Sequence, residues 1–460
     1  MHLWSNRDIL PLSKDSRRMN RKTLLIVALA LAATSCSRAL PTSPLGSREA
    51  DAFRSGSGSG GGAAPSAQSL SGQVAVTLAP GVTAATIAQA YGATVVTYVA
   101  SERTASFLPP AGVSALTFIN TLAIDPRIVT RESNTWIENA EARQQSFAFD
   151  DGFNSPLAYA DQTAGALIHL TDAHQIATGK GVKVAIIDTG VDATHPAFSG
   201  RVVGGWDFVS NDADPSDVRD FVDNDGDGRV DEAFGHGTHV AGIVRLVAPE
   251  AQFLVVRVLD ADGRGDLVTV AAGVRWAVQH GAKIINLSLG STSRLDALQD
   301  VLAEAELAGV TVIATAGNWG TNKTVDFPGT SSHAMCVAAV DGAGVGAAFS
   351  STGSEVELSA PGVAIRSAYP GNTYKQWSGT SMAAPFVTGT AALLAQKHPS
   401  WTLFDMETRL QATTTPLTGV PAGGKASLYG AGVLDAGAAL AADRALGGDA
   451  GETITLARGH

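Results

Sequence analysis

The feature that most constrains the fold is an alternation of apolar runs and helical patterns from about residue 158 to residue 442. The apolar runs are short and continuous, which is typical of strands that are buried on both faces of a sheet. Together with the intervening helical segments, they predict an α/β fold with a mostly parallel sheet and helices on both faces. We expect strands at 182–187, 253–259, 283–289, 310–316 and 335–340, and helices at 238–247, 267–280, 294–308, 382–398 and 403–412.

Composition agrees with a large buried core and restricts the partners. The chain has 460 residues, of which 45% are hydrophobic and 16% charged, so one large domain with smaller attachments is expected. Its net charge of −11 argues against nucleic acid as a partner, because phosphate binding favours a basic surface. We expect a monomer. Downstream of the N-terminus, no apolar run is long enough to span a membrane.

The N-terminal segment has the pattern of a secretory signal. A basic start at Arg21 and Lys22 precedes an apolar stretch from Leu24 to Ala33 and a small-residue exit. We therefore expect a signal peptide over 1–36, initiated at Met19, and a secreted or cell-envelope location. Its last residue, Cys36, resembles the acylated cysteine of bacterial lipoproteins and predicts a lipid anchor. The alternative is an ordinary signal with a chance cysteine.

Composition also divides the rest of the chain. Residues 37–69 are rich in glycine and serine and predict a flexible linker. Residues 70–145 alternate between strand and helix patterns, which predicts a small α+β domain with helices on an antiparallel sheet. A domain of this size is close to the lower limit for an independent core, so docking onto a larger neighbour would help it. Residues 150–445 form the large α/β domain, and 446–460 a C-terminal tail.

Three polar residues stand where acyl-transfer chemistry would need them. Asp188 closes an apolar strand, His236 opens a helix, and Ser381 lies in the segment GTSMAAP at the start of another helix. A free serine is a poor nucleophile, so it needs a base beside it and an acid that orients that base. Asn318, which follows a strand, offers an amide donor for an oxyanion. Asp188 and Ser381 each have an ordinary structural alternative, namely a turn aspartate and an N-cap.

A metal site is the alternative for the histidines. His236 and His239 share a helix face at i and i+3, but their spacing is not that of zinc proteases and no third ligand stands out. A metallohydrolase that uses these histidines and an acidic loop is therefore a competing function. We expect His239 to be a packed structural residue.

From about residue 158 to residue 442, the chain resembles the subtilisin-like serine proteases, or subtilases. The matching segments are 188–192 (DTGVD), 236–242 (HGTHVAG), 316–318 (AGN) and 379–385 (GTSMAAP). The resemblance implies Asp188 as the orienting acid, His236 as the base, Ser381 as the nucleophile and Asn318 as the oxyanion donor. A catalytically silent subtilase fold that serves as a binding module is a second competing function, against which the intact motifs speak.

The resemblance also implies how substrate binds and how the enzyme is made. An extended polypeptide would add as a strand to the exposed edges at 263–265 and 287–290. The substrate-binding residues are expected to be Gly263, Gly265, Ser288, Leu289, Gly290, Thr315 and Gly317. Within residues 70–145, the segment 73–140 is similar to the subtilase propeptide, which assists folding and acts as an intramolecular inhibitor until it is cleaved. We expect self-cleavage between Ala140 and Asp151.

An acidic loop predicts a structural calcium ion. Carboxylates alternate over residues 223–232, DNDGDGRVDE, as in the first half of an EF-hand loop, but the twelfth position is Phe234. The alternative is an acidic solvated loop without an ion. The calcium that many subtilisins hold in a loop after the catalytic histidine is not expected, since that loop is missing here. The expected ligands are Asp223, Asp225, Asp227, Asp231 and Glu232.

Overall fold

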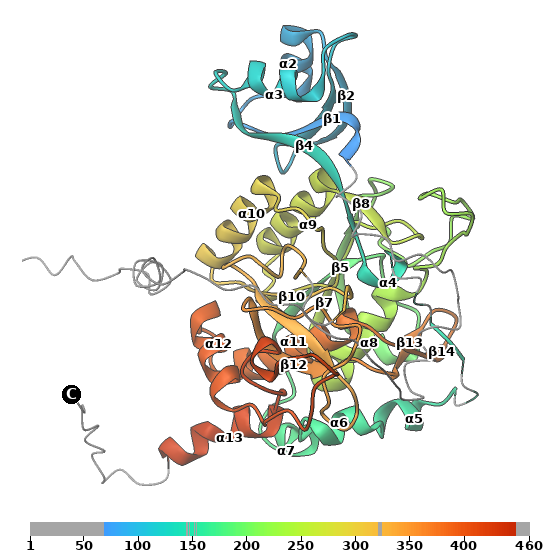
Figure 1. The fold of residues 1–460 in the computed structure, drawn as a ribbon, viewed down its shortest axis with the longest axis vertical. Coiled ribbons are helices and arrows are strands. Elements are labelled where there is room, and N and C mark those ends of the chain that lie inside the picture. Colours follow the sequence, from blue (N-terminus) through green and yellow to red (C-terminus); the bar gives the residue numbers. More distant parts are fainter. Residues whose placement is uncertain are drawn as a thin grey trace, which may run out of the picture. The chain divides into compact units, whose positions relative to one another are not determined.

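The computed structural model describes residues 69–447, apart from residues 144, 145, 147, 151, 153 and 321–323. Among these residues, the central element is a sheet with helices around it (Figure 1). The sheet has seven strands in the order β12-β11-β10-β9-β5-β7-β6. Every neighbouring pair in it is parallel, as predicted. Its strands are β5 (Lys183–Asp188), β6 (Val202–Asp207), β7 (Gln252–Arg257), β9 (Ile284–Leu287), β10 (Thr311–Thr315), β11 (Met335–Val340) and β12 (Val356–Pro361).

Helices cover both faces of this sheet. On β5, the side chains of Val184 and Ile186 join the core formed with α8 (His236–Val247) and α11 (Thr380–Lys397). The alternate residues of the same strand, Ala185 and Ile187, join the core formed with α9 (Leu267–Gln279) and α10 (Asp296–Leu307). Because both faces are buried, every residue of the strand except Lys183 is inaccessible, which explains its continuous apolar run.

The remaining elements lie around this sandwich. A hairpin of β13 (Ile365–Tyr369) and β14 (Thr373–Trp377) packs on α8. The helices are α5 (Pro156–Ala160), α6 (Thr163–Leu167), α7 (Leu170–His174), α12 (Leu403–Ala412) and α13 (Ala436–Gly447), with short 3₁₀ turns at Pro196–Phe198 and Ala426–Leu428. Cys336 is a free cysteine that is buried in β11, where it packs as a small apolar residue.

Residues 69–138 form the predicted helix-covered antiparallel sheet. Its strands pair in the order β2-β3-β1-β4, and a separate apolar core lies between this sheet and α2 and α3. Figure 1 shows the two helices beside the sheet. Its elements are β1 (Ser69–Leu78), α2 (Ala84–Tyr91), β2 (Thr94–Val99), β3 (Thr104–Leu108), α3 (Ala115–Leu122) and β4 (Ile128–Glu138). Beyond it, β4 pairs with β8 (Arg264–Asp266) and is followed by the short helix α4 (Ala140–Arg143).

The small sheet docks on α9 and α10 through polar contacts. The carboxylate of Glu132 accepts hydrogen bonds from the N–H groups of Asp296 (3.1 Å) and Ala297 (2.5 Å), which lie at the start of α10. A carboxylate is favoured at a helix start, where N–H groups have no partner within the helix. Arg275 of α9 reaches the carbonyl of Glu102 at 3.4 Å. The small domain therefore has the large neighbour that its size requires.

Three terminal predictions fall mainly outside the described residues. These are the signal peptide over 1–36, the linker up to residue 68 and the tail from residue 448 onward; the predicted tail itself begins inside α13. Within the described part of the chain, no helix combines the length and apolarity needed to cross a membrane.

We predict that the close packing of α8 on α11 leaves no room for a methyl group at Gly389. A Cβ atom there would lie 2.5 Å from the Cβ of Val247. Gly389→Ala should lower the free energy of unfolding by about 1–3 kcal/mol, as overpacking does. Urea unfolding in a Ser381→Ala background measures this change in the free energy of unfolding. The control is Gly165→Ala, where the nearest atom would lie 3.7 Å away; equal stability of the two variants would contradict the prediction.

Candidate active site

Asp188, His236 and Ser381 lie near one another at the carboxyl end of the strands of the large sheet. Asp188 is the last residue of β5, His236 the first of α8, and Ser381 the second of α11. The Nδ1 atom of His236 lies 2.7 Å from Oδ1 of Asp188 in a hydrogen bond, and all three side chains are fully buried. The same Asp188 oxygen accepts the N–H of Thr189 at 2.8 Å, which fixes the carboxylate against the end of the strand.

Close backbone packing brings β5 and α8 together. Gly237 follows His236, and a Cβ atom there would lie 2.1 Å from the carbonyl oxygen of Gly190 and 3.1 Å from the Cβ of Asp188. Only glycine therefore lets the first turn of α8 approach the end of β5. The ring of Trp377 contacts the His236 ring edge-on, with centroids 5.2 Å apart, and shields it from water.

Asp217 anchors the start of α8, and the sequence analysis missed it. Its buried carboxylate accepts hydrogen bonds from the N–H of Gly235 (3.0 Å), the N–H of Thr238 (3.1 Å) and the hydroxyl of Thr238 (2.6 Å). It therefore provides the side-chain cap that Gly235, the residue before the helix, lacks. Burial raises the pKa of Asp217 to about 6, against the opposing effect of these hydrogen bonds.

Asn318 lies beside Ser381 in a fixed orientation. Its Oδ1 atom accepts hydrogen bonds from the N–H (3.0 Å) and the hydroxyl (2.9 Å) of Thr380, the residue before Ser381. The Nδ2 donor is thereby directed into the site. There it joins the backbone N–H of Ser381, so two donors face one position at the start of α11.

A residue that no motif indicated, Glu141 of α4, occupies that position. Its Oε1 atom accepts from Nδ2 of Asn318 at 2.8 Å and from the N–H of Ser381 at 3.3 Å. Its Oε2 atom accepts from the Ser381 hydroxyl at 2.5 Å and lies 3.3 Å from Nε2 of His236. One oxygen of Glu141 therefore contacts both the serine and the imidazole. The Glu141 side chain is fully buried.

The two carboxylates hold His236 in its charged form. Burial alone would lower the pKa of His236, but the negative charges of Asp188 and Glu141 on either side of the ring raise it to about 10. Burial alone would raise the pKa of the Glu141 carboxyl group. The contacts with His236, Ser381 and Asn318 outweigh burial and lower this pKa. An imidazole with a proton on both nitrogens has no lone pair with which to accept another.

The predicted substrate edges hold a strand of this chain itself. Glu138 of β4 exchanges both backbone hydrogen bonds with Gly290, at 3.0 and 2.8 Å, and Asn139 donates to the carbonyl of Gly263 at 3.0 Å. On the β8 side, Ile137 pairs with Gly265. These contacts place Gly263, Gly265 and Gly290 at an edge that binds extended polypeptide.

The other predicted substrate residues are buried next to the site. The hydroxyl of Ser288 donates to the carbonyl of Ser381 at 3.1 Å and so braces the start of α11. Leu289 and Thr315 are buried, and Leu289 belongs to the core shared with α9 and α10. A Cβ atom at Gly317 would lie 2.5 Å from the Asp326 carboxylate, so glycine is required where the chain passes that residue.

His239 is a packed structural residue in this structure. Its Nε2 atom lies 3.1 Å from the carbonyl oxygens of both Ile365 and Lys375, and its ring contacts the ring of Trp377 edge-on. Burial, followed by the charge of His236, lowers the pKa of His239 to about 3. The ring is therefore neutral and bound to the β13–β14 hairpin.

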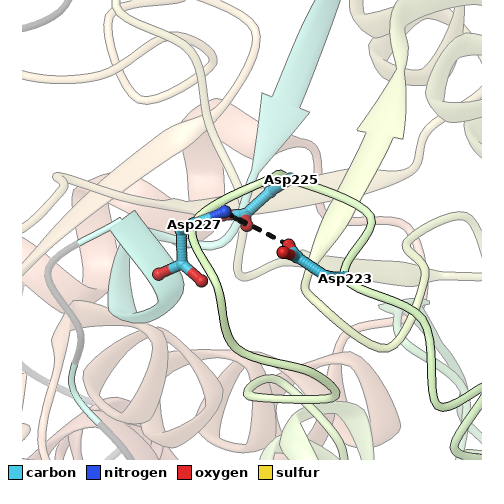
Figure 2. A group of neighbouring side chains, drawn as sticks. All are labelled: Asp223, Asp225 and Asp227. Carbon is cyan, nitrogen blue, oxygen red and sulfur yellow. Dashed lines mark hydrogen bonds between the residues drawn. The ribbon is translucent and has the colours of Figure 1, made fainter.

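The acidic loop brings three of its five expected ligands together. Figure 2 shows Asp223, Asp225 and Asp227, each of which has a carboxylate oxygen within 4.8 Å of the others. Asp231 and Glu232, the other two expected ligands, are not part of this group. The carboxylate of Asp231 is occupied by the N–H groups of Asp220 and Phe221, both at 3.0 Å.

The fold and the site define a class of α/β proteins in which an Asp–His pair lies beside a serine at a helix start. The model of the subtilase family matches residues 179–432. This chain is 42% identical over 270 residues to the thermostable alkaline protease of Halalkalibacterium halodurans, covering 57% of this chain and 68% of that protein. It is 40% identical over 271 residues to subtilisin BL of Lederbergia lenta, covering 57% and 91%.

A solved structure is similar over more of the chain. Fervidolysin from Fervidobacterium pennivorans, a keratinolytic enzyme related to subtilisin, superposes with a TM-score of 0.65 at 25% identity. The match covers 81% of this chain and 61% of that one. The chain belongs to the subtilase family. Like its relatives in that family, it is a serine endopeptidase.

We predict that Asp217 makes the stability of the protein depend on pH. Its folded pKa of about 6 lies above its ordinary value of 3.8. The folded state therefore binds this proton more tightly, and the associated stability is present below pH 4 and lost as the pH rises through 6. Between pH 4 and pH 7, the free energy of unfolding should fall by roughly 2–3 kcal/mol more in the parent than in Asp217→Asn.

Urea unfolding at several pH values in a Ser381→Ala background measures this difference. The matched control is Asp161→Asn, which removes one exposed negative charge. Parallel pH profiles of the parent and Asp217→Asn would show that Asp217 is ionised in the same way in both states, contrary to the prediction.

Proposed function

We propose that Asp188, His236 and Ser381 form a catalytic triad and that Asn318 stabilises the oxyanion. The observation that carries this assignment is the placement of the Glu141 carboxylate. One negatively charged oxygen accepts from Asn318 and the N–H of Ser381, while the other contacts the Ser381 hydroxyl and His236. The site therefore stabilises negative charge on an oxygen beside the serine, as acyl transfer requires.

The proposed reaction follows from these contacts. When His236 is neutral, its Nε2 atom takes the Ser381 proton as the hydroxyl attacks the peptide carbonyl carbon. Asp188 holds the Nδ1–H of the ring and stabilises the imidazolium that forms. The carbonyl oxygen becomes an oxyanion that Asn318 and the Ser381 N–H stabilise. His236 then protonates the leaving amine, and water releases the acyl group from Ser381.

The substrate in this proposal is an extended polypeptide that adds as a strand. The pairing of residues 136–139 with β8 and Gly290 supports it, because it consists of backbone hydrogen bonds that any sequence can make. The protein side chains that face the reacting serine would then determine which substrate residue is preferred at the cleaved bond.

The proposal includes an inactive precursor. Residues 70–145 would act as the propeptide and intramolecular inhibitor, which is supported by the docking of Glu132 on α10 and by the strand in the substrate edge. Secretion through the signal over 1–36, and a lipid anchor at Cys36, belong to the same proposal. Labelling with radioactive palmitate tests the anchor: incorporation that is lost in Cys36→Ala supports it, and no incorporation contradicts it.

We further propose a structural calcium ion in the loop of Asp223, Asp225 and Asp227. Hard carboxylate oxygens from alternating positions of a short loop suit Ca²⁺. The carboxylates around this loop repel one another. Burial and then the negative charge of Asp262 raise the pKa of Glu232 to about 7. A bound cation would offset this repulsion.

The competing functions are separated by one inhibition experiment. A serine-reactive phosphonate should abolish peptidase activity, and a zinc chelator should leave it unchanged. The opposite pattern would favour a metallohydrolase, and the absence of any peptidase activity would favour a silent binding module.

We predict that Asn318→Ala lowers kcat by a factor of about 10²–10³ and changes KM little. This magnitude is the one measured for the corresponding kind of donor in subtilisin, a relative of this chain. The donor acts on charge that develops only in the transition state, so substrate affinity should be spared. Steady-state kinetics on a chromogenic peptide measures both constants in the mature enzyme. A loss confined to KM would instead place Asn318 in ground-state binding.

We predict that calcium stabilises the protein through the acidic loop. Addition of Ca²⁺ at about one hundred times its dissociation constant should raise the free energy of unfolding by about 2.7 kcal/mol, since the ion binds only the folded state. Thermal melts with and without a chelator measure the effect. The double variant Asp223→Asn/Asp225→Asn should lose it. An equal response of this variant and the parent would place the calcium elsewhere.

A further inference from the structure

We propose that the chain cleaves itself at the peptide bond between Ala140 and Glu141, and that the Glu141 carboxylate delays this step by occupying the oxyanion site. The inference rests on the proposed triad and sharpens the expectation of self-cleavage between Ala140 and Asp151 to a single bond. Two independent observations carry it: the backbone register of residues 136–139 and the contacts of the Glu141 side chain.

The register fixes which part of the chain is held at the site. Backbone pairing with β8 runs from Trp136 to Glu138, and Gly290 pairs with Glu138 from the other side. The last hydrogen bond of this kind joins the N–H of Asn139 to the carbonyl of Gly263 at 3.0 Å. The chain is therefore fixed between two edges up to Asn139, in the manner of a bound substrate.

The first carbonyl group beyond this fixed strand is that of Ala140. Ala140 is 3% exposed, so it is enclosed at the site. The next carbonyl, that of Glu141, already accepts the N–H of Ser146 at 2.8 Å. The Ser381 hydroxyl lies against the side chain of Glu141. The bond that joins the fixed strand to the residue at the nucleophile is Ala140–Glu141.

The side chain of Glu141 prevents attack in the observed arrangement. It takes both donors, Asn318 and the Ser381 N–H, that the oxygen of a tetrahedral intermediate would need. It also lies against His236 at 3.3 Å and stabilises the charged ring, which cannot then accept the serine proton. Cleavage requires this carboxylate to leave, so that the adjacent Ala140 carbonyl can take its place.

The chemical step is then a balanced acyl transfer. Ser381 Oγ bonds to the Ala140 carbonyl carbon and gives its proton to His236. The carbon–nitrogen bond breaks, and His236 gives the proton to the nitrogen of Glu141, which becomes the new N-terminus. Water then attacks the ester, its proton passes through His236 to Ser381, and the Ala140 carboxylate is released.

Mass spectrometry of the full-length chain after self-processing tests the bond. The expected first product pair ends at Ala140 and begins at Glu141, in the parent and not in Ser381→Ala. Time-resolved sampling identifies the first cleavage before any later trimming. A first cut at any other bond, in an enzyme that hydrolyses a peptide substrate, would overturn the proposal and leave the proposed function intact. Absence of both self-cleavage and peptide hydrolysis would instead reject the triad.

Substitution of Glu141 tests the delay. Glu141→Ala should raise the first-order rate of self-cleavage by about tenfold or more, because a charge-assisted occupant of the oxyanion donors is removed. Glu141→Gln should give a smaller increase, since its amide oxygen still accepts from Asn318 but carries no charge. The matched control is Asp150→Asn, an exposed carboxylate beyond α4, which should cleave at the parental rate.

Unchanged or slower cleavage in both Glu141 variants would overturn the role of the carboxylate. Each variant is also made in the Ser381→Ala background, where far-ultraviolet circular dichroism and melting temperature show whether it folds. A folded Glu141→Ala chain that cleaves no faster than the parent counts against the proposal, and a misfolded one leaves Glu141→Gln to decide it.

Discussion

The structure depends on the convergence of one strand end and two helix starts. The carboxyl end of β5 places Asp188 where the amino ends of α8 and α11 place His236 and Ser381. Unpaired N–H groups at helix starts favour negative charge, and the end of a parallel strand is where α/β sheets collect polar side chains. The fold thus creates a buried position that stabilises an anionic oxygen before any particular ligand is considered.

The anion that occupies this position also determines the protonation state of the His236 imidazole. With Glu141 present, His236 lies between two carboxylates and keeps its second proton. Without Glu141, Asp188 alone faces the ring, and the driving force for protonation decreases. In the proposed mechanism, the contact that fills the oxyanion site therefore also disables the base. Inhibition and catalysis would then use one set of donors, so that release of a single side chain would suffice to pass from one to the other.

The sequence was sufficient to predict those strands and site residues that short local patterns specify. Central strands such as β5 and β10 are buried on both faces, so their apolar runs were recognisable, and the residues around Asp188, His236, Asn318 and Ser381 lie in short motifs. The edge strands β6 and β12 were missed. Two glycines interrupt β6, most of which is only partly buried, and polar residues and a proline interrupt β12, although most of its residues are buried.

Glu141 and Asp217 were missed for a different reason: their roles come from distant residues. Nothing near Asp217 in the sequence distinguishes it from a loop aspartate, and only the fold brings it to the start of α8. Glu141 is separated from Ser381 by most of the chain, and its partners are the same donors that the motifs assign to the substrate. Burying a carboxylate is costly, and the cost is offset only when an opposite charge and hydrogen-bond donors are already in place, as His236, Asn318 and the Ser381 N–H are here. The residue that completes the site is thus the one whose position no local pattern could specify.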